Sequence, residues 1–468
     1  MESPKTTKLI KAARLKGFND YLPSEALLKQ KFLRIMQKQA EVCGFLSMQT
    51  PTLEYAETLL GEGGETDKQV YKFLDNGERE VALRYDLTVP FSRFVAEHFA
   101  ELVLPFKRFE SGQVFRAEKP QKGRYREFCQ SDFDIIGVDS VLADVEVLAC
   151  LGRTLSEFDI GEIEFRINNR FVLSALIKYF LPQLATDQET AVLIQLDKLD
   201  KLSVELVLQQ MILIPGVDAS GGKKLLDFST QSETQDWEIC LTQLRGLFIA
   251  EANATKELDR FEETLILLKN LKLPRIDFQL DLKIARGLAY YTGIVFEAQL
   301  LAIPGFGSIC SGGRYNQLAS RFIKQDLPGV GGSIGLDRLV SGVSELKKTE
   351  LNLDCYIIVT SSHYDAFAYD ALTTLRNSGL RCDINLQAQK KIAAQLRQAN
   401  RLNARFAVII GEEEFKTHSY VLKDLLQQQE FKNISLEAML ETMLDALQKP
   451  RPSPPNQKSE PTQGGNTQ

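Results

Sequence analysis

Hydrophobic and polar positions change their spacing several times along the chain. Near the N-terminus, apolar residues at helical spacing predict a helix that runs to about Val42, with Ser24 as its N-cap. A short apolar stretch then leads to Pro51, which should end a strand or lie at a sheet edge. From about 81 to 137 the sequence alternates as strands do, with short loops. Residues from about 170 to 275 are rich in leucine with a period near 3.6, which predicts a helical insertion.

Strand-like sequence returns at IVFEAQL and continues through a glycine-rich turn to Gly335, and a charged segment at about 347–352 indicates a linker. Beyond the linker, strands alternate with helices: CYIIVT, a helix from Tyr364 to about Arg376, CDINL, a helix from about Gln389 to Leu402, and FAVIIG. This alternation predicts right-handed crossovers and a small, mainly parallel sheet. The last segment is rich in Pro, Gly, Ser and Gln, and we expect it to be disordered.

Composition mainly excludes classes of protein. No apolar run approaches the roughly 20 residues of a membrane span. The basic N-terminus MESPKTTKLIKAARLKG lacks the apolar region of a secretory signal, so we predict a cytoplasmic protein. The seven cysteines form no CxxC pair and the three histidines are far apart, so no metal site is expected. A net charge of −6 argues against a surface that coats nucleic acid, although local basic patches remain possible.

Two predicted strands carry unusual rows of polar side chains. In VALRYDLTVP a period of two places Arg84, Asp86 and Thr88 on one face. In EFCQSDFDIIG the same period aligns Phe128, Gln130, Asp132 and Asp134. Buried carboxylates are costly unless they are paired or used, and a solvated sheet face is the simpler interpretation of either strand alone. Two such strands in one region favour a polar pocket.

The segment VFRAEKPQKGRYREF lies between these two strands and contains a basic loop. Arg116 precedes the loop, which then carries four cationic residues: Lys119, Lys122, Arg124 and Arg126. Arginine can make two parallel hydrogen bonds to one phosphate, so the loop suits a polyphosphate, although a solvated loop would have a similar sequence. Phe128 follows and offers a flat face on which an aromatic base could stack.

Three glycine-containing segments complete the candidate chemistry. In ARGLAYYTG, Arg286 stands beside a glycine and is followed by Tyr290 and Tyr291, and the glycine pair of CSGGRYNQL would allow close backbone approach to a ligand. GGSIG matches a nucleophile elbow centred on Ser333, with His363 in the order of an α/β-hydrolase. That hypothesis is disfavoured, because no strong strand precedes the turn and the histidine lies beyond the linker. The sequence has no P-loop, so arginines would have to bind any phosphate.

Taken together and in this order, the segments resemble the histidyl-tRNA synthetases, a family of class II aminoacyl-tRNA synthetases. FKRFESGQVFRAEKPQKGRYREFCQSDFDIIG resembles motif 2, RGLAYYTG and SGGRYNQL resemble the two histidine-specific peptides, and GGSIGLDRL resembles motif 3. Pro51 falls where the motif 1 proline of the dimer interface belongs. The resemblance covers about residues 16 to 445. Ala289 departs from it, because the commonest family form has aspartate there.

The resemblance implies a role for each residue of the candidate site. Histidine would be bound by Asp86, Thr88, Arg116, Gln130, Asp134, Arg286, Tyr290 and Tyr291. ATP, accompanied by Mg²⁺, would be bound by Arg116, Glu118, Arg124, Arg126, Phe128 and Arg338. Arg116 and Arg286 would be catalytic, and the resemblance implies that they would lie on opposite sides of the α-phosphate. The implied reaction attaches L-histidine to histidine tRNA through a histidyl-adenylate.

The resemblance also implies an architecture of the α/β class. A catalytic α+β domain on a mostly antiparallel sheet would span residues 1–345, with the insertion at about 170–275. A mainly parallel anticodon-binding domain would span 346–447, before a disordered tail at 448–468. The expected assembly is a homodimer, without a membrane. Contacts to tRNA would come from Gln121, Lys390, Lys391, Arg397 and Arg401.

A non-catalytic relative, the synthetase-like regulatory subunit of ATP phosphoribosyltransferase, is the alternative. That relative typically lacks the C-terminal domain and loses motif residues. The presence of Arg116, Arg286 and Arg338, together with the additional domain, favours the enzyme.

Overall fold

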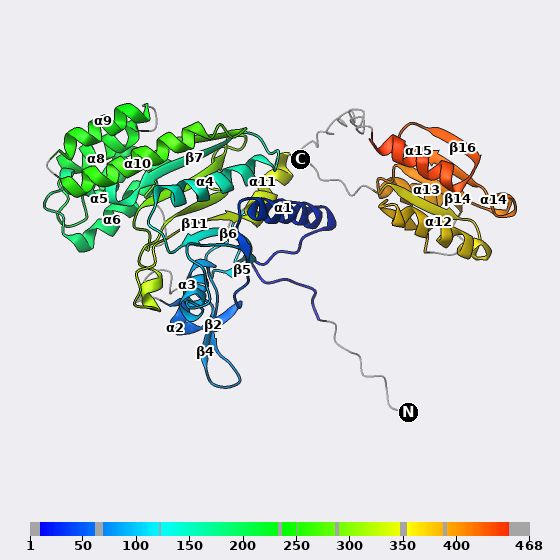
Figure 1. Cartoon of the computed structure of the whole chain (residues 1–468), viewed down its shortest axis with the longest axis horizontal. Helices are drawn as coiled ribbons and strands as arrows, with labels where there is room; N and C mark the ends of the chain where they lie inside the picture. The colour runs from blue at the N-terminus through cyan, green and yellow to red at the C-terminus, as the bar shows by residue number, and fades with distance from the viewer. Residues whose placement is uncertain are drawn as a thin grey trace, which may run out of the picture. The chain divides into compact units, whose positions relative to one another are not determined.

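The computed structural model describes residues 10–60, 69–120, 123–232, 236–249, 251–285, 290–346, 353–386 and 391–448. Internal contacts divide the chain into two compact units, residues 1–349 and 350–468 (Figure 1). The predicted domain limits themselves stay predictions, and the predicted tail lies almost entirely outside the described residues. Within the described part of the chain, no helix is both long and apolar enough to span a membrane.

A large sheet runs through the first unit and has eight strands in the described residues, in the order β1-β5-β6-β11-β10-β9-β7-β8. The strands are β1 (Leu46–Ser47), β5 (Phe106–Phe115), β6 (Glu127–Ile136), β7 (Ile163–Asn169), β8 (Ile276–Leu280), β9 (Ile294–Leu300), β10 (Cys310–Arg314) and β11 (Gly329–Gly335). The pairs β1–β5 and β7–β8 at its two ends are parallel, and the five pairs between them are antiparallel. The predicted mostly antiparallel sheet is therefore confirmed.

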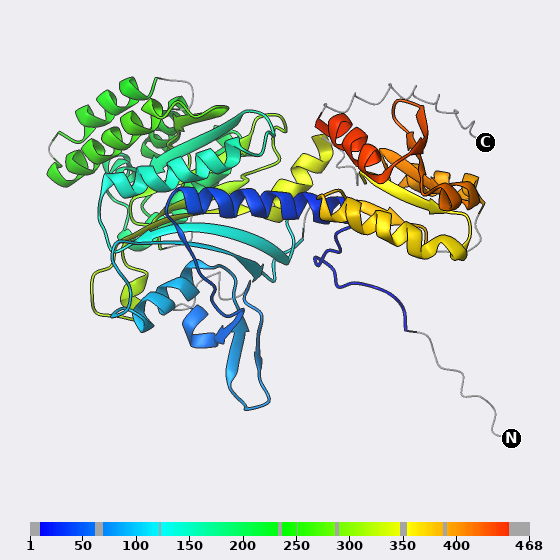
Figure 2. The same ribbon diagram turned by 45° about the vertical axis from the view of Figure 1, so that its right-hand side comes forward.

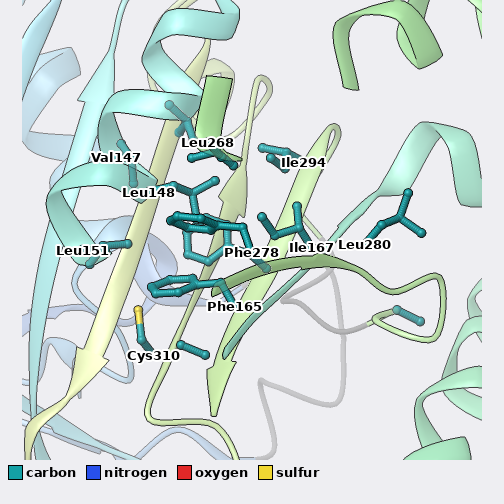
Figure 3. Close-up of a cluster of buried hydrophobic side chains, with 14 of the residues drawn as sticks. Val147, Leu148, Leu151, Phe165, Ile167, Leu268, Phe278, Leu280, Ile294 and Cys310 are labelled. Carbon is teal, nitrogen blue, oxygen red and sulfur yellow. The ribbon is translucent and has the colours of Figure 1, made fainter. Parts of the chain in front are cut away.

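Three helices cover one face of this sheet: α1 (Pro23–Val42), α4 (Val141–Ser156) and α11 (Leu336–Leu346). Figures 1 and 2 show α1 and α4 on the same side of the strands. Leu148 and Leu151 of α4 pack with Phe165 of β7 and Phe278 of β8 in the main hydrophobic core (Figure 3). The proline that begins α1 suits the first helical position, and the N-cap is the preceding leucine rather than the predicted Ser24.

The predicted helical insertion corresponds to the segment between β7 and β8. Its helices are α5 (Arg170–Phe180), α6 (Glu189–Leu196), α7 (Val204–Met211), α8 (Ala219–Gln231), α9 (Trp237–Leu247) and α10 (Ala252–Asn270). Several begin with a polar cap, as where the Asn169 side chain accepts hydrogen bonds from the first backbone N–H groups of α5. Because β7 and β8 are parallel neighbours, a long crossover between them is required, and these helices provide it.

The region from 81 to 137 contains a helix that alternation did not predict. A small antiparallel sheet of β2 (Leu53–Tyr55), β4 (Glu80–Leu83) and β3 (Lys72–Leu74) adjoins the short α2 (Ala56–Leu59). The expected strand VALRYDLTVP ends at Leu83, and α3 (Thr88–Glu97) begins five residues later. The Asp86 carboxylate accepts a hydrogen bond from the Val89 N–H, and Pro90 fits the first turn, so this polar segment starts a helix.

The second unit has a five-stranded sheet in the order β13-β12-β14-β15-β16. Its strands are β12 (Cys355–Val359), β13 (Cys382–Ile384), β14 (Phe406–Ile410), β15 (Tyr420–Asp424) and β16 (Gln429–Ile434), and its helices are α12 (Asp365–Asn377), α13 (Ile392–Arg401), α14 (Glu412–Thr417) and α15 (Leu436–Gln448). The strands β13, β12 and β14 are parallel, as predicted. The last two strands, which were not predicted, add two antiparallel pairs, so the sheet as a whole is mixed.

We expect Phe165→Ala to lower the free energy of unfolding of the first unit by about 3–5 kcal/mol, because it leaves a cavity among packed rings. Phe165 is fully buried and its ring centroid lies 5.2 Å from that of Phe278. Urea unfolding followed by the fluorescence of Trp237, the single tryptophan, measures the change. Phe171→Ala, at a position that is 39% exposed, is the control and should cost much less. Equal losses would contradict this account of the core.

Candidate active site

Three polar side chains line one face of β6, a strand inside the large sheet between β5 and β11. Gln130, Asp132 and Asp134 are all buried there. Gly331 of β11 lies opposite Asp134, and a Cβ at that glycine would collide with the Asp134 carboxylate. The glycines of β11 therefore leave room for acidic side chains on the neighbouring strand. The predicted polar face of this strand is thus buried, and a solvated sheet face is ruled out.

Tyr290 and Tyr291 lie beside these carboxylates. The Tyr290 hydroxyl donates to Asp86 at 3.5 Å, and the ring centroids of Tyr290 and Tyr291 are 4.9 Å apart. The Tyr315 hydroxyl donates to Oδ1 of Asp134 at 2.5 Å. Four segments that are distant in the sequence therefore meet in one buried polar site, which we call the polar pocket: the turn before α3, β6, the Tyr290–Tyr291 pair and Tyr315 of CSGGRYNQL. Burial raises the pKa of Tyr290, and a side-chain hydrogen bond with Thr88 partly opposes this rise, so Thr88, at the start of α3, also lies beside the tyrosine.

Burial controls the charge of this pocket. Desolvation raises the pKa of Asp86 to about 6 and that of Asp132 to about 7, and it also raises the pKa of Asp134. Among the described residues, Oε1 of Gln130 and Oδ1 of Asp132 have no hydrogen-bond donor. Buried acceptors without donors are rare in native proteins, so the pocket suits a ligand that brings N–H groups or a positive charge.

Arg116 lies at the edge of this pocket, just after β5. Its Nε donates to the Tyr85 carbonyl at 3.0 Å, and its guanidinium carbon lies 5.1 Å from the centroid of the Phe128 ring. Glu118 and Arg124 form an ion pair in the following loop. Arg126 donates to the Glu118 carbonyl at 3.0 Å and to the Lys16 carbonyl at 3.3 Å. Backbone oxygens thus hold the side chains of Arg116 and Arg126. These two arginines, together with the Glu118–Arg124 ion pair, form one cationic group.

Arg338 joins this region from the first turn of α11. It donates to the Ser308 carbonyl at 2.9 Å and to the Gly123 carbonyl at 3.4 Å. The preceding Asp337 is buried, pairs with Lys29 of α1 at 2.6 Å, and accepts a hydrogen bond from the Cys129 N–H, next to Phe128. The Asp337 carboxylate therefore connects the first turn of α11, which carries Arg338, to β6, which carries Phe128.

Several residues of this network were not predicted as site residues. Arg108, Glu110 and Tyr315 contact the carboxylates directly or through each other. Arg108 and Glu110 lie on β5 (FKRFESGQVF), where the same period of two that marked the neighbouring strand would have placed them on one face. The predicted site residues Gln121, Arg286 and Lys390, together with Lys122 of the basic loop and Ala289, lie outside the described residues.

Two other hypotheses concerned the glycine-rich segments. Gly312 lies in β10 directly opposite Gly332 of β11, so its missing Cβ permits close packing of two strands, and approach of a ligand to the Gly312–Gly313 pair stays a prediction. Ser333 lies inside β11 and accepts a hydrogen bond from Nε2 of Gln130 at 2.8 Å, while His363 belongs to the other unit. A nucleophile elbow needs a turn, so the hydrolase hypothesis fails on geometry.

In the second unit, Lys391, Arg397 and Arg401 are exposed on and just before α13. Arg405, which belongs to the same basic segment of the sequence, is instead buried, where it donates to the Ala446 carbonyl at 2.7 Å. Of these four cationic residues, only the three on or just before α13 are therefore exposed to solvent.

The comparison with known proteins decides the family. The family model of histidyl-tRNA synthetases matches residues 17–339, and the anticodon-binding domain model matches residues 354–446. The chain belongs to the histidyl-tRNA synthetase family. A histidine–tRNA ligase from Wolinella succinogenes is 36% identical over 444 residues, which are 94% of this chain and 100% of that relative. The family predicted from the sequence is confirmed, as is the class of enzyme.

Solved structures agree with this assignment. The crystal structure of histidyl-tRNA synthetase from Nostoc sp. PCC 7120 has a TM-score of 0.81 at 28% identity, covering 94% of this chain and 100% of that one. An ATP phosphoribosyltransferase regulatory subunit/histidyl-tRNA synthetase from Bacillus halodurans C has a TM-score of 0.69 at 22% identity, covering 84% and 97%. The second likeness shows the fold alone, so it does not favour the regulatory alternative.

We expect Asp86→Asn to stabilise the ligand-free protein at pH 8 by up to about 3 kcal/mol. The pKa of Asp86 is about 6 in the folded state and 3.8 ordinarily, so the folded wild type binds the proton more tightly. Its stability therefore falls as pH rises from about 4 to about 6, and asparagine removes this loss. Urea unfolding at pH 4 and pH 8 measures the difference, which should vanish at pH 4. Asp75→Asn is the control, because Arg79 lowers the pKa of that exposed carboxyl and no gain at pH 8 is expected. A gain at both pH values for Asp86→Asn would show that burial of its charge is not the cause.

Proposed function

We propose that this chain activates L-histidine with ATP and transfers the histidyl group to histidine tRNA in the cytoplasm. The observation that carries the proposal is the buried pocket of Asp86, Gln130 and Asp134, with Arg116 at its edge and Tyr290 and Tyr291 beside the carboxylates. Buried acceptors suit the ammonium and imidazole N–H groups of histidine, and the cationic group around Arg116 suits the phosphates of ATP. Membership of the ligase family supports the same reaction.

In the proposed first step, a carboxylate oxygen of histidine attacks the α-phosphorus and the bond to the pyrophosphate oxygen breaks. Arg116 and Arg286 stabilise the charge that develops on the equatorial oxygens, and the pocket holds the reactants in line. Phe128 and Arg338 bind the adenine ring, with Arg124 and Arg126 near the phosphates. The adenylate is then attacked by a terminal ribose hydroxyl of the tRNA, which releases AMP.

Mg²⁺ fits this arrangement as a companion of ATP. It usually binds through one or two carboxylates together with substrate phosphates, and Glu118 is a carboxylate within the cationic loop. When bound, the ion neutralises phosphate charge. The protein's own contribution is to hold Glu118 beside Arg124, so that a carboxylate and a guanidinium face the same phosphates.

For tRNA we propose the exposed cations of the second unit, Lys391, Arg397 and Arg401, together with Lys390 and with Gln121 of the segment that resembles motif 2. The match of this unit to anticodon-binding domains and the exposure of the three described side chains support the assignment. Phosphate contacts of this kind position an RNA and weaken with salt.

Histidine-dependent exchange of pyrophosphate into ATP tests the proposed function. We expect Arg116→Ala to reduce exchange by about 10²-fold or more, because it removes a charge aimed at the transition state. Arg245→Ala is the control, since this arginine pairs with Asp259 on the surface of the insertion and should keep full exchange. Exchange that does not need histidine, or that survives Arg116→Ala, would refute the proposal. Binding of histidine without any exchange by the wild type would instead point to a regulatory protein.

We also propose that the chain is a homodimer that pairs through the region after Pro51. Leu53 and Tyr55 of β2 are 42% and 53% exposed, and Phe73 of β3 is 47% exposed. Tyr55 and Phe73 are both register partners of Val81 on β4, so the three side chains share one face of the small sheet. A contiguous apolar face of this kind is typical of a protein interface.

The dimer predicts different effects for two adjacent residues. We expect Phe73→Asp to give a monomer at micromolar concentration in sedimentation velocity, because a charge would be buried in the interface. Leu74→Asp is the matched control: Leu74 is 66% exposed and points to the opposite face of the same strand, so the dimer should persist. A wild type that sediments as a monomer, or a dimer in both variants, would contradict the proposed interface.

A further inference from the structure

Arg108 is a fully buried arginine near the start of β5, with 0% of its surface exposed. It is the register partner of Asp134 on β6, so the two side chains lie on the same face of the sheet. Its guanidinium carbon lies 4.5 Å from the centroid of the Phe91 ring of α3. A buried guanidinium needs partners for its charge and its N–H groups, and here the partners come from separate segments.

The contacts of Arg108 connect two parts of the proposed histidine site. One nitrogen, Nη2, lies 3.0 Å from Oδ2 of Asp134 and donates to the Leu87 carbonyl at 3.0 Å. Leu87 stands between Asp86 and Thr88, two of the proposed histidine ligands. A single guanidinium therefore fixes the turn before α3 relative to β6.

We propose that Arg108 is a positioning residue of the amino-acid site, which sets the spacing between the Asp86–Thr88 turn and Asp134. The inference rests on the proposed function, because it takes these residues as histidine ligands. Arg108 itself touches no substrate in this scheme. It acts through the groups that do.

Several titratable groups surround this guanidinium, and they determine its electrostatic effect. Glu110 on β5 lies 3.2 Å from Nη1, and Asp132 on β6 lies 3.6 Å from Nη2. Asp86 faces it from the turn before α3, and the Tyr315 hydroxyl reaches Asp134 from the segment after β10. Without the positive charge of Arg108, these carboxyl groups would repel one another in a buried site and would take up protons more readily.

The test compares Arg108→Lys and Arg108→Met with the wild type in histidine-dependent pyrophosphate exchange. The lysine variant keeps the charge but has one compact ammonium group that cannot reproduce the guanidinium geometry. We expect its KM for histidine to rise about tenfold, the loss of about one hydrogen bond to a charged group, while its KM for ATP stays within about twofold. In the methionine variant the KM for histidine should rise further, and the acid limb of kcat/KM for histidine should move up by about one pH unit or more.

Arg166→Lys is the matched control, because Arg166 is also a buried arginine of the same sheet that pairs with carboxylates, Asp200 and Asp281. These carboxylates are not proposed ligands, so the KM for histidine and the pH profile should not change. If the methionine variant does not fold, the KM values of the lysine variant alone test the inference. A lysine variant with the wild-type KM for histidine, or an equal rise in both KM values, would overturn the inference. Failure of the wild type to exchange would instead refute the proposed function.

Discussion

The ion pair between Arg108 and Asp134 joins two neighbouring strands inside the first unit, and the polar pocket depends on it. The carboxylates of β6 lie inside a sheet whose other residues form a hydrophobic core, where an unpaired charge would be strongly unfavourable. The pairing does not return them to an ordinary state, because desolvation still raises the pKa of Asp132 and Asp134. The pocket is thus held together while part of its charge remains available to a ligand.

The surrounding sheet is built to accommodate these side chains. Gly331 and Gly332 lie on β11 beside β6, and a Cβ at either would collide with a side chain, Asp134 in the first case and Leu151 in the second. Gly112 on β5 leaves space for the Arg84 guanidinium in the same way. Glycine weakens a strand, so three glycines in central strands are explained by the polar groups and helices that pack against them.

Sequence alone predicted the parts of this site that lie on regular elements. The alternation of EFCQSDFDIIG placed Gln130 and Asp134 on one face correctly, because a strand fixes the direction of every second side chain. The same rule failed at Thr88, where a helix begins with a proline in its first turn and a Val89 N–H that donates to Asp86, since local hydrogen bonds there outweigh the alternation. The role of Arg108 could not be predicted, because its partners at Leu87 and Asp134 are brought together only by the tertiary fold.

The pKa values of the pocket connect its stability to its proposed chemistry. Burial leaves Asp86 and Asp132 less able to ionise than in water, so these two groups make the folded protein less stable at neutral pH than in acid. A bound ammonium group would add a second positive charge beside the buried carboxylates, in addition to Arg108, and would lower their pKa values again. The electrostatic cost of folding and the affinity for a cationic substrate therefore come from the same buried carboxylates. Replacing these carboxylates with apolar residues would stabilise the fold, but it would also remove the proposed binding site.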